Sequence, residues 1–303
     1  MIYAIRHTTR FLYEAPVRFA RCNLRLRPID WDGQKRERYH LDITPHATIS
    51  TPLPSGYPAN TVRVVVDAPA SELVIESRSR IVVNRPMPQI LPDDPSVGEI
   101  ARLARQVRDL SMTAPANYMF ASPMIPIEPS IVTWCAETVN RDDGIVAACF
   151  ALAKRIKAEF RYKSGVTDTD TAPIDAFDRR TGVCQDFAQI MISGLRGLGL
   201  PAAYVSGYLR TLPPPGKQRL VGADATHAWV LVWCGPARGW IGFDPTNGIM
   251  MAGDHIVAAV GRDYADVSPI DGIFLGRNGQ RVDVSVDVEP IEEETPRPTR
   301  KRR

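Results

Sequence analysis

The 303-residue chain lacks long apolar segments and has little net charge. A membrane-spanning helix needs about 20 consecutive apolar residues, and no stretch approaches that length. The first residues, MIYAIRH, alternate apolar and polar side chains, so the uninterrupted apolar segment of a secretory signal is missing. A net charge of +3 is too small to indicate a nucleic-acid-binding protein. We therefore expect a soluble, cytoplasmic protein with neither nucleic acid nor membrane as partner.

Cysteine is scarce, and no two cysteines are separated by only two residues. Disulfide frameworks and structural zinc sites typically use closely spaced cysteines, so we expect neither here. The acidic loop of an EF-hand calcium site is also missing. We predict no metal and no organic cofactor, so each cysteine is either buried or reactive. The five are Cys22, Cys135, Cys149, Cys184 and Cys234.

Residues 1–90 have the pattern of short β-strands. Apolar and polar side chains alternate in residues 2–9 and again in residues 73–83, which is typical of strands with one buried face. Proline-bearing segments such as residues 51–58 separate these runs as turns. The pattern predicts an N-terminal β-sandwich-like module without a catalytic cluster.

Helical patterns begin after a proline-rich segment. We expect residues 91–165 to form a helical bridge that is part of the core, with Ser96 and Glu99 as a capping box. Cys149 lies on the apolar face of a helix predicted over residues 145–160, so it is expected to be buried. A further helix should begin at or near Cys184 and end before Gly199.

Strand-like segments follow that helix at residues 202–210, 226–233 and 240–244. A helix followed by consecutive strands predicts an α+β fold with an antiparallel sheet over a core of residues 166–280. Residues 287–303 carry an acidic block, a basic block and several prolines, so we expect a disordered tail. The loop at 211–223 is long and proline-rich, and it could form a rim of the site.

Cys184 is the best candidate for a reactive side chain. A cysteine attacks an amide as the thiolate, and a helix N-terminus or a neighbouring imidazole lowers the thiol pKa. The predicted start of a helix supplies the first of these, and Gly182 permits the tight turn before it.

His227 and Asp244 are the best candidates to complete the site. If residues 226–233 and 240–244 form an antiparallel hairpin, opposed residues have a constant index sum. An odd sum places His227 and Asp244 on one face. A sum of 471 sets them directly opposite, and a sum of 473 makes them diagonal neighbours. In either register the aspartate could hydrogen-bond the imidazole and fix its tautomer.

Three motifs resemble those of the bacterial transglutaminase-like superfamily. They are GVCQDF at residues 182–187, DATHAW at 224–229 and GFDPTNG at 242–248, in the family's order of Cys, His and Asp. The opening YAIRHTT at residues 3–9, LRLRP at 24–28 and GRDYADV at 261–267 also resemble family segments, so the resemblance covers most of residues 1–275.

This resemblance implies a papain-like, transglutaminase-like α+β core with a Cys-His-Asp triad. Cys184 would form a thioester, His227 would act as base and Asp244 would orient His227. The favoured activity is a cysteine peptidase or amidase that hydrolyses a peptide or isopeptide amide of a peptide or protein substrate. Two alternatives remain open: a protein-glutamine acyltransferase with the same triad, and a non-catalytic binding or assembly module.

The surroundings of the triad are less defined by the sequence. The Cys184 backbone N–H at the helix start is a natural donor to the oxyanion of the reaction, and the sequence does not identify a second one. Several further side chains could support the site or touch substrate. They are Gln185, Asp186, Tyr208, Trp229, Asp263 and Tyr264.

Overall fold

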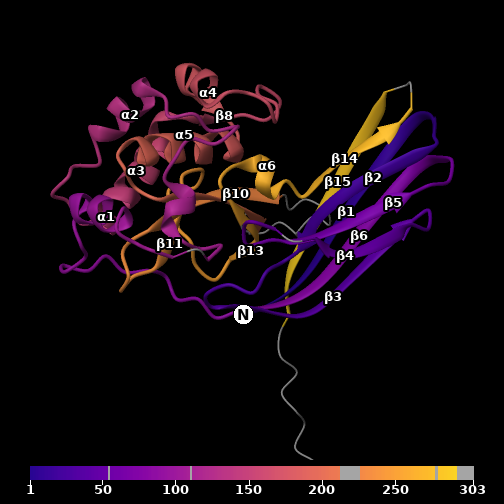
Figure 1. Cartoon of the computed structure of the whole chain (residues 1–303), viewed down its shortest axis with the longest axis horizontal. Coiled ribbons are helices and arrows are strands. Elements are labelled where there is room, and N and C mark those ends of the chain that lie inside the picture. Colours follow the sequence, from indigo (N-terminus) through magenta and orange to yellow (C-terminus); the bar gives the residue numbers. More distant parts are fainter. Residues whose placement is uncertain (54, 110, 212–225, 277–278, 292–303) are drawn as a thin grey trace, which may run out of the picture.

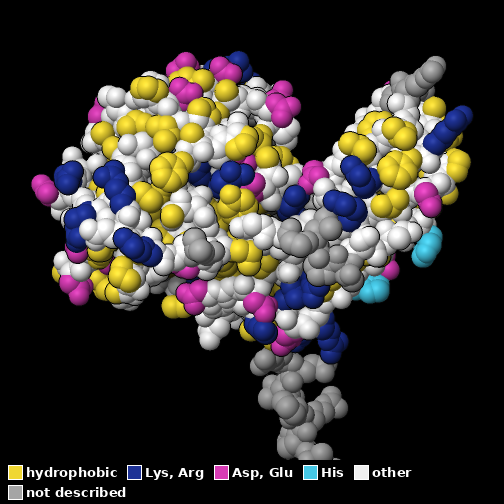
Figure 2. Space-filling view, viewed as in Figure 1, with side chains coloured by type: hydrophobic (Ala, Val, Ile, Leu, Met, Phe, Trp, Pro, Cys, Tyr) yellow, Lys and Arg dark blue, Asp and Glu magenta, His cyan; other side chains and the backbone are white. Residues whose placement is uncertain are grey.

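A computed structural model describes residues 1–53, 55–109, 111–211, 226–276 and 279–291 of the chain. Figure 1 shows two bodies side by side, an elongated β-sandwich and a rounded body of helices packed on a sheet. Figure 2 shows a hollow between them on this face, with acidic and basic side chains interspersed over both bodies. No helix in the described ranges is both long enough and apolar enough to cross a membrane.

The sandwich consists, within the described residues, of two four-stranded sheets in the orders β15-β1-β6-β3 and β14-β2-β5-β4. All of their strand pairs are antiparallel, and buried aliphatic side chains such as Leu24, Val64 and Ile75 fill the space between the sheets. The strands are β1 (Ile2–Val17), β2 (Phe19–Arg27), β3 (Gln34–Thr44), β4 (Thr48–Leu53), β5 (Asn60–Val66), β6 (Ala70–Val83), β14 (Ile270–Leu275) and β15 (Gln280–Ile291).

The last two strands correct the predicted domain boundaries. β15 pairs with β1 from Ile2 opposite Ile291 to Tyr13 opposite Gln280, and β14 pairs with β2. The segment 270–291 therefore completes the N-terminal sandwich. The core predicted to reach residue 280 ends earlier, and residues 287–291 are not part of a tail. The reason is an alternation of valines in β15 that buries Val286 and Val288. Residues 292–303 lie outside the described ranges.

The second body contains the helices and a sheet whose strands differ in length. The antiparallel sheet has the order β12-β11-β10-β9-β13 in the described part of the chain, and α5 packs on β10 and β9. The predicted α+β fold with an antiparallel sheet is confirmed. Its sheet strands are β9 (Ala202–Leu209), β10 (Thr226–Trp233), β11 (Trp240–Asp244), β12 (Ile249–Met250) and β13 (His255–Gly261). The remaining elements are α1 (Val97–Ala104), a 3-10 helix (Pro115–Tyr118), α2 (Pro129–Ala136), α3 (Ile145–Glu159), α4 (Pro173–Arg179), α5 (Cys184–Gly197), α6 (Tyr264–Val267) and the two-residue strands β7 (Arg161–Tyr162) and β8 (Thr181–Gly182).

Local sequence accounts for the helix positions. Ser96 caps α1 by accepting a hydrogen bond from the Glu99 N–H at 3.2 Å, as the capping pattern predicts. The α3 residues Ile145, Cys149, Leu152 and Ile156 are all fully buried, so Cys149 belongs to the core. Burying this apolar stripe against α5 and β11 fixes the helix over the sheet.

Polar contacts join the two bodies. The Gln34 side chain donates to the Val257 carbonyl and accepts from the Val257 N–H, both at 2.8 Å. Gln34, the first residue of β3, therefore links the sandwich to the backbone of β13. Tyr3 Oη donates to Asp254 Oδ1 at 2.7 Å, immediately before that strand. The sandwich is thus hydrogen-bonded to the segment that leads into β13.

Candidate active site

Cys184 is the first residue of α5, as the sequence predicts. Asp186 closes the turn before it, because Asp186 Oδ2 accepts hydrogen bonds from the Val183 N–H and from Thr167 Oγ1, each at 2.7 Å. A Cβ atom on Gly182 would lie 2.5 Å from Asp186 Oδ2, so this turn requires glycine. The free N–H groups at the helix start favour a negative charge on the Cys184 sulfur.

The other four cysteines differ from Cys184 in exposure. Cys184 is the one cysteine of the five, all of them within the described residues, whose side chain is not buried. Burial raises the pKa of the Cys22 thiol to about 11 and that of Cys135 to about 12. Burial likewise raises the pKa values of Cys149 and Cys234. A thiolate is therefore unfavourable at those four positions.

The β10–β11 hairpin brings His227 and Asp244 together. Val230 lies opposite Phe243, which gives an index sum of 473, the diagonal register of the two allowed by the sequence. His227 Nε2 lies 2.8 Å from Asp244 Oδ2. The hairpin turn is six residues long. It spans the residues between Trp233 and Trp240 and is closed by the Gly239 N–H donating to the Gly235 carbonyl.

Asp244 is a fully buried carboxylate with several donors. Its Oδ1 accepts from the backbone N–H groups of Thr246 and Asn247, at 2.9 and 3.1 Å, and its Oδ2 accepts from Asn247 Nδ2 at 2.7 Å. Burial alone would raise the pKa of this carboxyl, but the hydrogen bonds from the two histidines and Asn247 outweigh burial and hold the pKa below its ordinary value. Asp244 is therefore ionised at neutral pH.

His227 is poised to carry a proton. Burial lowers its pKa, but hydrogen bonds with Asp244 and with Cys184 outweigh burial and raise the pKa well above the usual value. Since Asp244 engages Nε2, Nδ1 is the ring nitrogen left for the thiol. The arrangement can hold a thiolate beside an imidazolium, with a buried carboxylate behind it.

His255 is a member of the site that the sequence analysis missed. Its Nε2 lies 3.3 Å from Asp244 Oδ2, the oxygen that also contacts His227, and its side chain is buried. It reaches the site because β13 pairs with β9, which pairs with β10. The sequence did contain a signal for this role. His255 directly precedes the apolar segment IVAAV, and a polar side chain buried there requires a hydrogen-bond partner.

Two of the predicted supporting residues do not form groove walls. Tyr208 is buried, and its hydroxyl lies 3.0 Å from His7 Nδ1 at the contact with the sandwich. Trp229 has no exposed surface; its ring stacks on His227 at a centroid distance of 6.0 Å. Neither side chain can line a groove, because adjacent sheets and loops cover this face of β9 and β10. Trp229 instead backs the imidazole of His227.

The other predicted supporting residues have local roles. Gln185 Nε2 donates to the Thr169 carbonyl, and Asp186 forms the helix cap described above. Asp263 caps α6 through the Ala265 N–H and also accepts from the Met124 N–H. Tyr264 packs edge-on against Tyr204 at a centroid distance of 6.3 Å.

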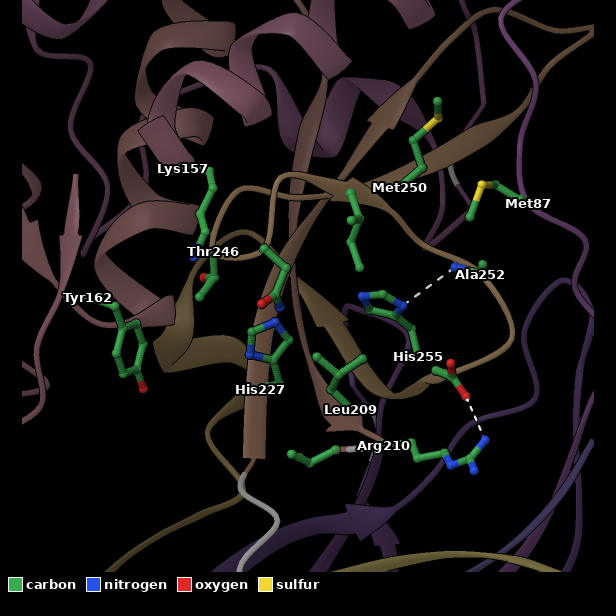
Figure 3. A pocket seen from close by; sticks show the side chains of 14 residues that line it. Met87, Lys157, Tyr162, Leu209, Arg210, His227, Thr246, Met250, Ala252 and His255 are labelled. Atoms are coloured by element: carbon green, nitrogen blue, oxygen red, sulfur yellow. Dashed lines mark hydrogen bonds and ion pairs between the residues drawn. The ribbon is translucent and has the colours of Figure 1, made fainter. Parts of the chain in front are cut away.

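A cavity of about 680 Å³ opens beside His227. Figure 3 shows His227 and His255 on its wall, with Lys157 and Tyr162 on one side and Met87 on the other. Met87 comes from the segment between the sandwich and α1, whereas the other lining residues belong to the second body. Apolar and charged side chains share the lining, which suits a peptide more than a purely apolar ligand. The predicted rim at 211–223 lies almost entirely outside the described residues.

No group of three or more His, Cys, Asp or Glu side chains in the described ranges is arranged to hold a metal ion. The polar groups around Asp244 bind one another, and the chemistry available to them is proton transfer and nucleophilic attack by sulfur.

Comparison with known proteins identifies the family of the chain. Residues 3–82 match the bacterial transglutaminase-like N-terminal region, and residues 133–245 match the transglutaminase-like superfamily. An uncharacterised protein of Mycobacterium tuberculosis is 36% identical over 298 residues, covering 96% of this chain and 93% of that protein.

A protein-glutamine gamma-glutamyltransferase of Pseudomonas aeruginosa is 40% identical over 100 residues, which cover 32% of this chain and 15% of that protein. A solved structure of a Cytophaga hutchinsonii protein, designated a candidate cysteine protease, superposes with a TM-score of 0.70 at 18% identity. It covers 96% of this chain and 92% of that one, and so shows the shared fold. With this fold, these two matching regions and a full-length relative, the chain belongs to the transglutaminase-like superfamily.

Proposed function

We propose that the protein is a cysteine-dependent hydrolase that cleaves a peptide or isopeptide amide through a thioester on Cys184. The observation that carries the proposal is the hydrogen-bonded series Asp244, His227 and Cys184, with the one unburied cysteine at a helix start. The helix N-terminus and the imidazole each stabilise the thiolate. Together they supply a nucleophile and its base in one place.

The first half of the reaction forms the thioester. The Cys184 thiolate attacks the amide carbonyl carbon, and the carbonyl oxygen becomes an oxyanion that the Cys184 N–H can stabilise. The carbon–nitrogen bond then breaks while the His227 imidazolium gives its proton to the leaving amine. His227 is neutral after this step, and Asp244 fixes the tautomer that can accept the next proton.

The second half of the reaction hydrolyses the thioester. Neutral His227 takes a proton from water as the water oxygen attacks the thioester carbonyl. The carbon–sulfur bond breaks, and the carboxylic acid product and the thiolate–imidazolium pair are formed. The reaction requires a peptide or protein substrate and no redox partner. The cytoplasmic location expected from the sequence stays a prediction.

Acyl transfer to an amine is the second candidate function, and the match to the Pseudomonas aeruginosa protein-glutamine gamma-glutamyltransferase favours it. Water and an amine compete for the same thioester, so both functions use the same three residues. His227, the base that would deprotonate an acceptor amine, lines the cavity.

The experiment incubates the protein with a peptide mixture and a fluorescent primary amine, and mass spectrometry records new termini, new glutamates and amine adducts. We expect cleavage or deamidation that is lost in Cys184→Ala and His227→Ala and retained in His46→Ala, which alters an exposed histidine outside the site. Amine adducts that depend on Cys184 would instead establish the acyltransferase.

A third outcome would remove both functions. If no Cys184-dependent product forms, and iodoacetamide titrates Cys184 as an ordinary thiol with a pKa of about 8.5, the paired nucleophile does not exist. The protein would then be a binding or assembly module.

A further inference from the structure

Asp244 Oδ2 is shared by two histidines from different strands. His227 on β10 contacts it at 2.8 Å, and His255 at the start of β13 contacts it at 3.3 Å. The two imidazole rings lie 6.4 Å apart between centroids, and Figure 3 shows them side by side along the cavity wall. Asn247 Nδ2 is a third donor to the same oxygen.

The hydrogen bonds of His255 define which of its ring nitrogens carries the proton. Its Nδ1 lies 3.4 Å from the Ala252 N–H, which can only donate, so Nδ1 accepts. In the neutral ring Nε2 then carries the proton and donates it to Asp244. A neutral donor from this side stabilises the charge of the buried carboxylate and fixes the plane in which it meets His227.

Arg85 holds the backbone around His255. Its Nη1 donates to the His255 carbonyl at 3.0 Å and to the Ala252 carbonyl at 3.4 Å. Its Nε and Nη2 donate to the Asp32 carbonyl in the sandwich, at 3.0 and 2.8 Å. Arg85 follows β6, so one guanidinium joins the sandwich to both backbone carbonyls that flank the hydrogen-bonded turn at His255.

Other contacts keep the His255 ring in place. Trp229 meets it edge to face at a centroid distance of 5.2 Å, and the Trp229 N–H donates to Met251 Sδ at 3.2 Å. Besides the two histidines, the cavity has the charged side chains of Lys157, Arg210 and Asp254, and the charged atoms of Arg210 and Asp254 lie 3.6 Å apart. Asp254 also accepts from Tyr3, so that acid is already engaged.

We propose that His255 is a positioning residue for Asp244, and that Arg85 of the sandwich holds His255 for this task. The inference rests on the proposed function, because it assumes that Asp244 orients His227. It assigns the sandwich a role: its residues hold the segment that completes the support of the active site.

The proposal has an electrostatic consequence. Removing the His255 donor leaves the carboxylate of Asp244 with more negative charge facing the imidazolium. The imidazolium then loses its proton at higher pH, and the thiolate, beside a more negative site, also forms at higher pH. Both limbs of the pH profile of Cys184 reactivity should therefore move upward. A loss of packing alone would lower reactivity without moving the limbs.

The experiment measures the pH dependence of Cys184 alkylation by iodoacetamide in the full chain. His255→Phe keeps a ring against Trp229 and removes the donor, whereas His255→Gln retains an N–H at the reach of Nε2. We expect His255→Phe to raise both limbs by about one pH unit and to lower kcat about 10-fold with little change in KM. His255→Gln should restore most of the wild-type profile.

Arg85 supplies a second, independent variant. Arg85→Met should move the limbs in the same direction as His255→Phe, by less. Arg80→Met is the matched control, because Arg80 is on β6 and bonds to Glu37 within the sandwich. If Arg85 acts through His255, Arg85→Met adds no further shift of the limbs in the His255→Phe background.

The outcomes separate this inference from the proposed function. If the wild type shows no His227-dependent reactivity at low pH, the proposed function fails and this inference fails with it. If the wild type shows the paired profile and both His255→Phe and Arg85→Met reproduce it, His255 is not a positioning residue and the proposed function stands. If His255→Phe does not fold, the Arg85→Met profile decides alone.

Discussion

Two sets of charged side chains, one in each body of the molecule, differ in how they are held. On the sandwich, Arg80 pairs with Glu37 and Arg10 with Glu72, and all four side chains are about one third to one half exposed. In the second body, Asp186, Asp244 and Asp263 are essentially unexposed, and each accepts backbone N–H groups. Surface pairs are solvated and readily rearranged, whereas buried carboxylates impose one geometry.

Two buried carboxyls of the second body also differ from each other, in the direction of their pKa shifts. Hydrogen bonds lower the pKa of Asp244 despite its burial, whereas burial outweighs the hydrogen bonds of Asp186 and raises its pKa. Among the described residues Asp186 Oδ1 has no hydrogen-bond partner, whereas both oxygens of Asp244 accept hydrogen bonds.

The largest expected effect is on activity at Asp244. Asp244→Asn should lower kcat/KM by about 10³-fold to 10⁴-fold, because the amide no longer favours the required tautomer or the imidazolium. This corresponds to about 4–5.5 kcal/mol. Asp42→Asn, on the sandwich surface, is the control and should retain activity. Less than a 10-fold loss at Asp244 would show that it does not orient His227.

The next effect is on stability where the two bodies meet. Val286 on β15 is fully buried beside core residues such as Tyr208, whereas Val284 on the same strand is 55% exposed. Val286→Ala should lower the free energy of unfolding by about 2 kcal/mol, measured by urea denaturation. Val284→Ala should change it by less than about 0.5 kcal/mol. Equal effects would show that β15 does not pack as the structure has it.

A smaller effect is expected at the cap of α5. Asp186→Ala removes the acceptor of the Val183 N–H and should lower the free energy of unfolding by about 1 kcal/mol. A carboxyl with a raised pKa in the folded state stabilises the fold most at low pH. The gap between wild type and variant should therefore be largest below about pH 4 and narrow as pH rises. Urea denaturation over pH tests this sign, and a gap that widens with pH would contradict it.

The smallest effect is expected at the sandwich surface. Arg80→Met should change the free energy of unfolding by less than about 1 kcal/mol, because the partly exposed pair with Glu37 is screened by solvent. The same denaturation experiment, repeated at high salt, should abolish the difference. A loss as large as that expected for Val286→Ala would show that this exposed ion pair stabilises the fold as much as a buried side chain does.

The sequence predicted much of the second body because its signals are local. The helix start at Cys184 follows from the pattern around residues 182–187, and strand alternation shows that His227 and Asp244 share a face if the index sum is odd. Alternation could not distinguish 471 from 473, since both place His227 and Asp244 on one face. The six-residue turn between Trp233 and Trp240, in which the Gly239 N–H donates to the Gly235 carbonyl, decides between them.

The missed features depend on contacts between distant segments. His255 joins the site through the strand order β10-β9-β13, which no local pattern reveals. Residues 287–291 seemed to belong to a tail because an acidic block follows them, although the alternating valines of β15 preceded it. The burial of Tyr208 and Trp229 depends on how the sandwich and loops pack on the sheet, which the sequence does not show.

The pairing of β1 with β15 has a consequence for how the chain folds. Ile2 lies opposite Ile291, so the sheet that begins with the first strand cannot be completed until nearly the whole chain has been synthesised. Until then β1 has β6 on one side and an open edge on the other. Pairings between such distant segments are slow to form. Assembly of the sandwich is therefore expected to follow that of the helix and sheet body, whose strands β9 to β13 lie within about 60 residues of one another.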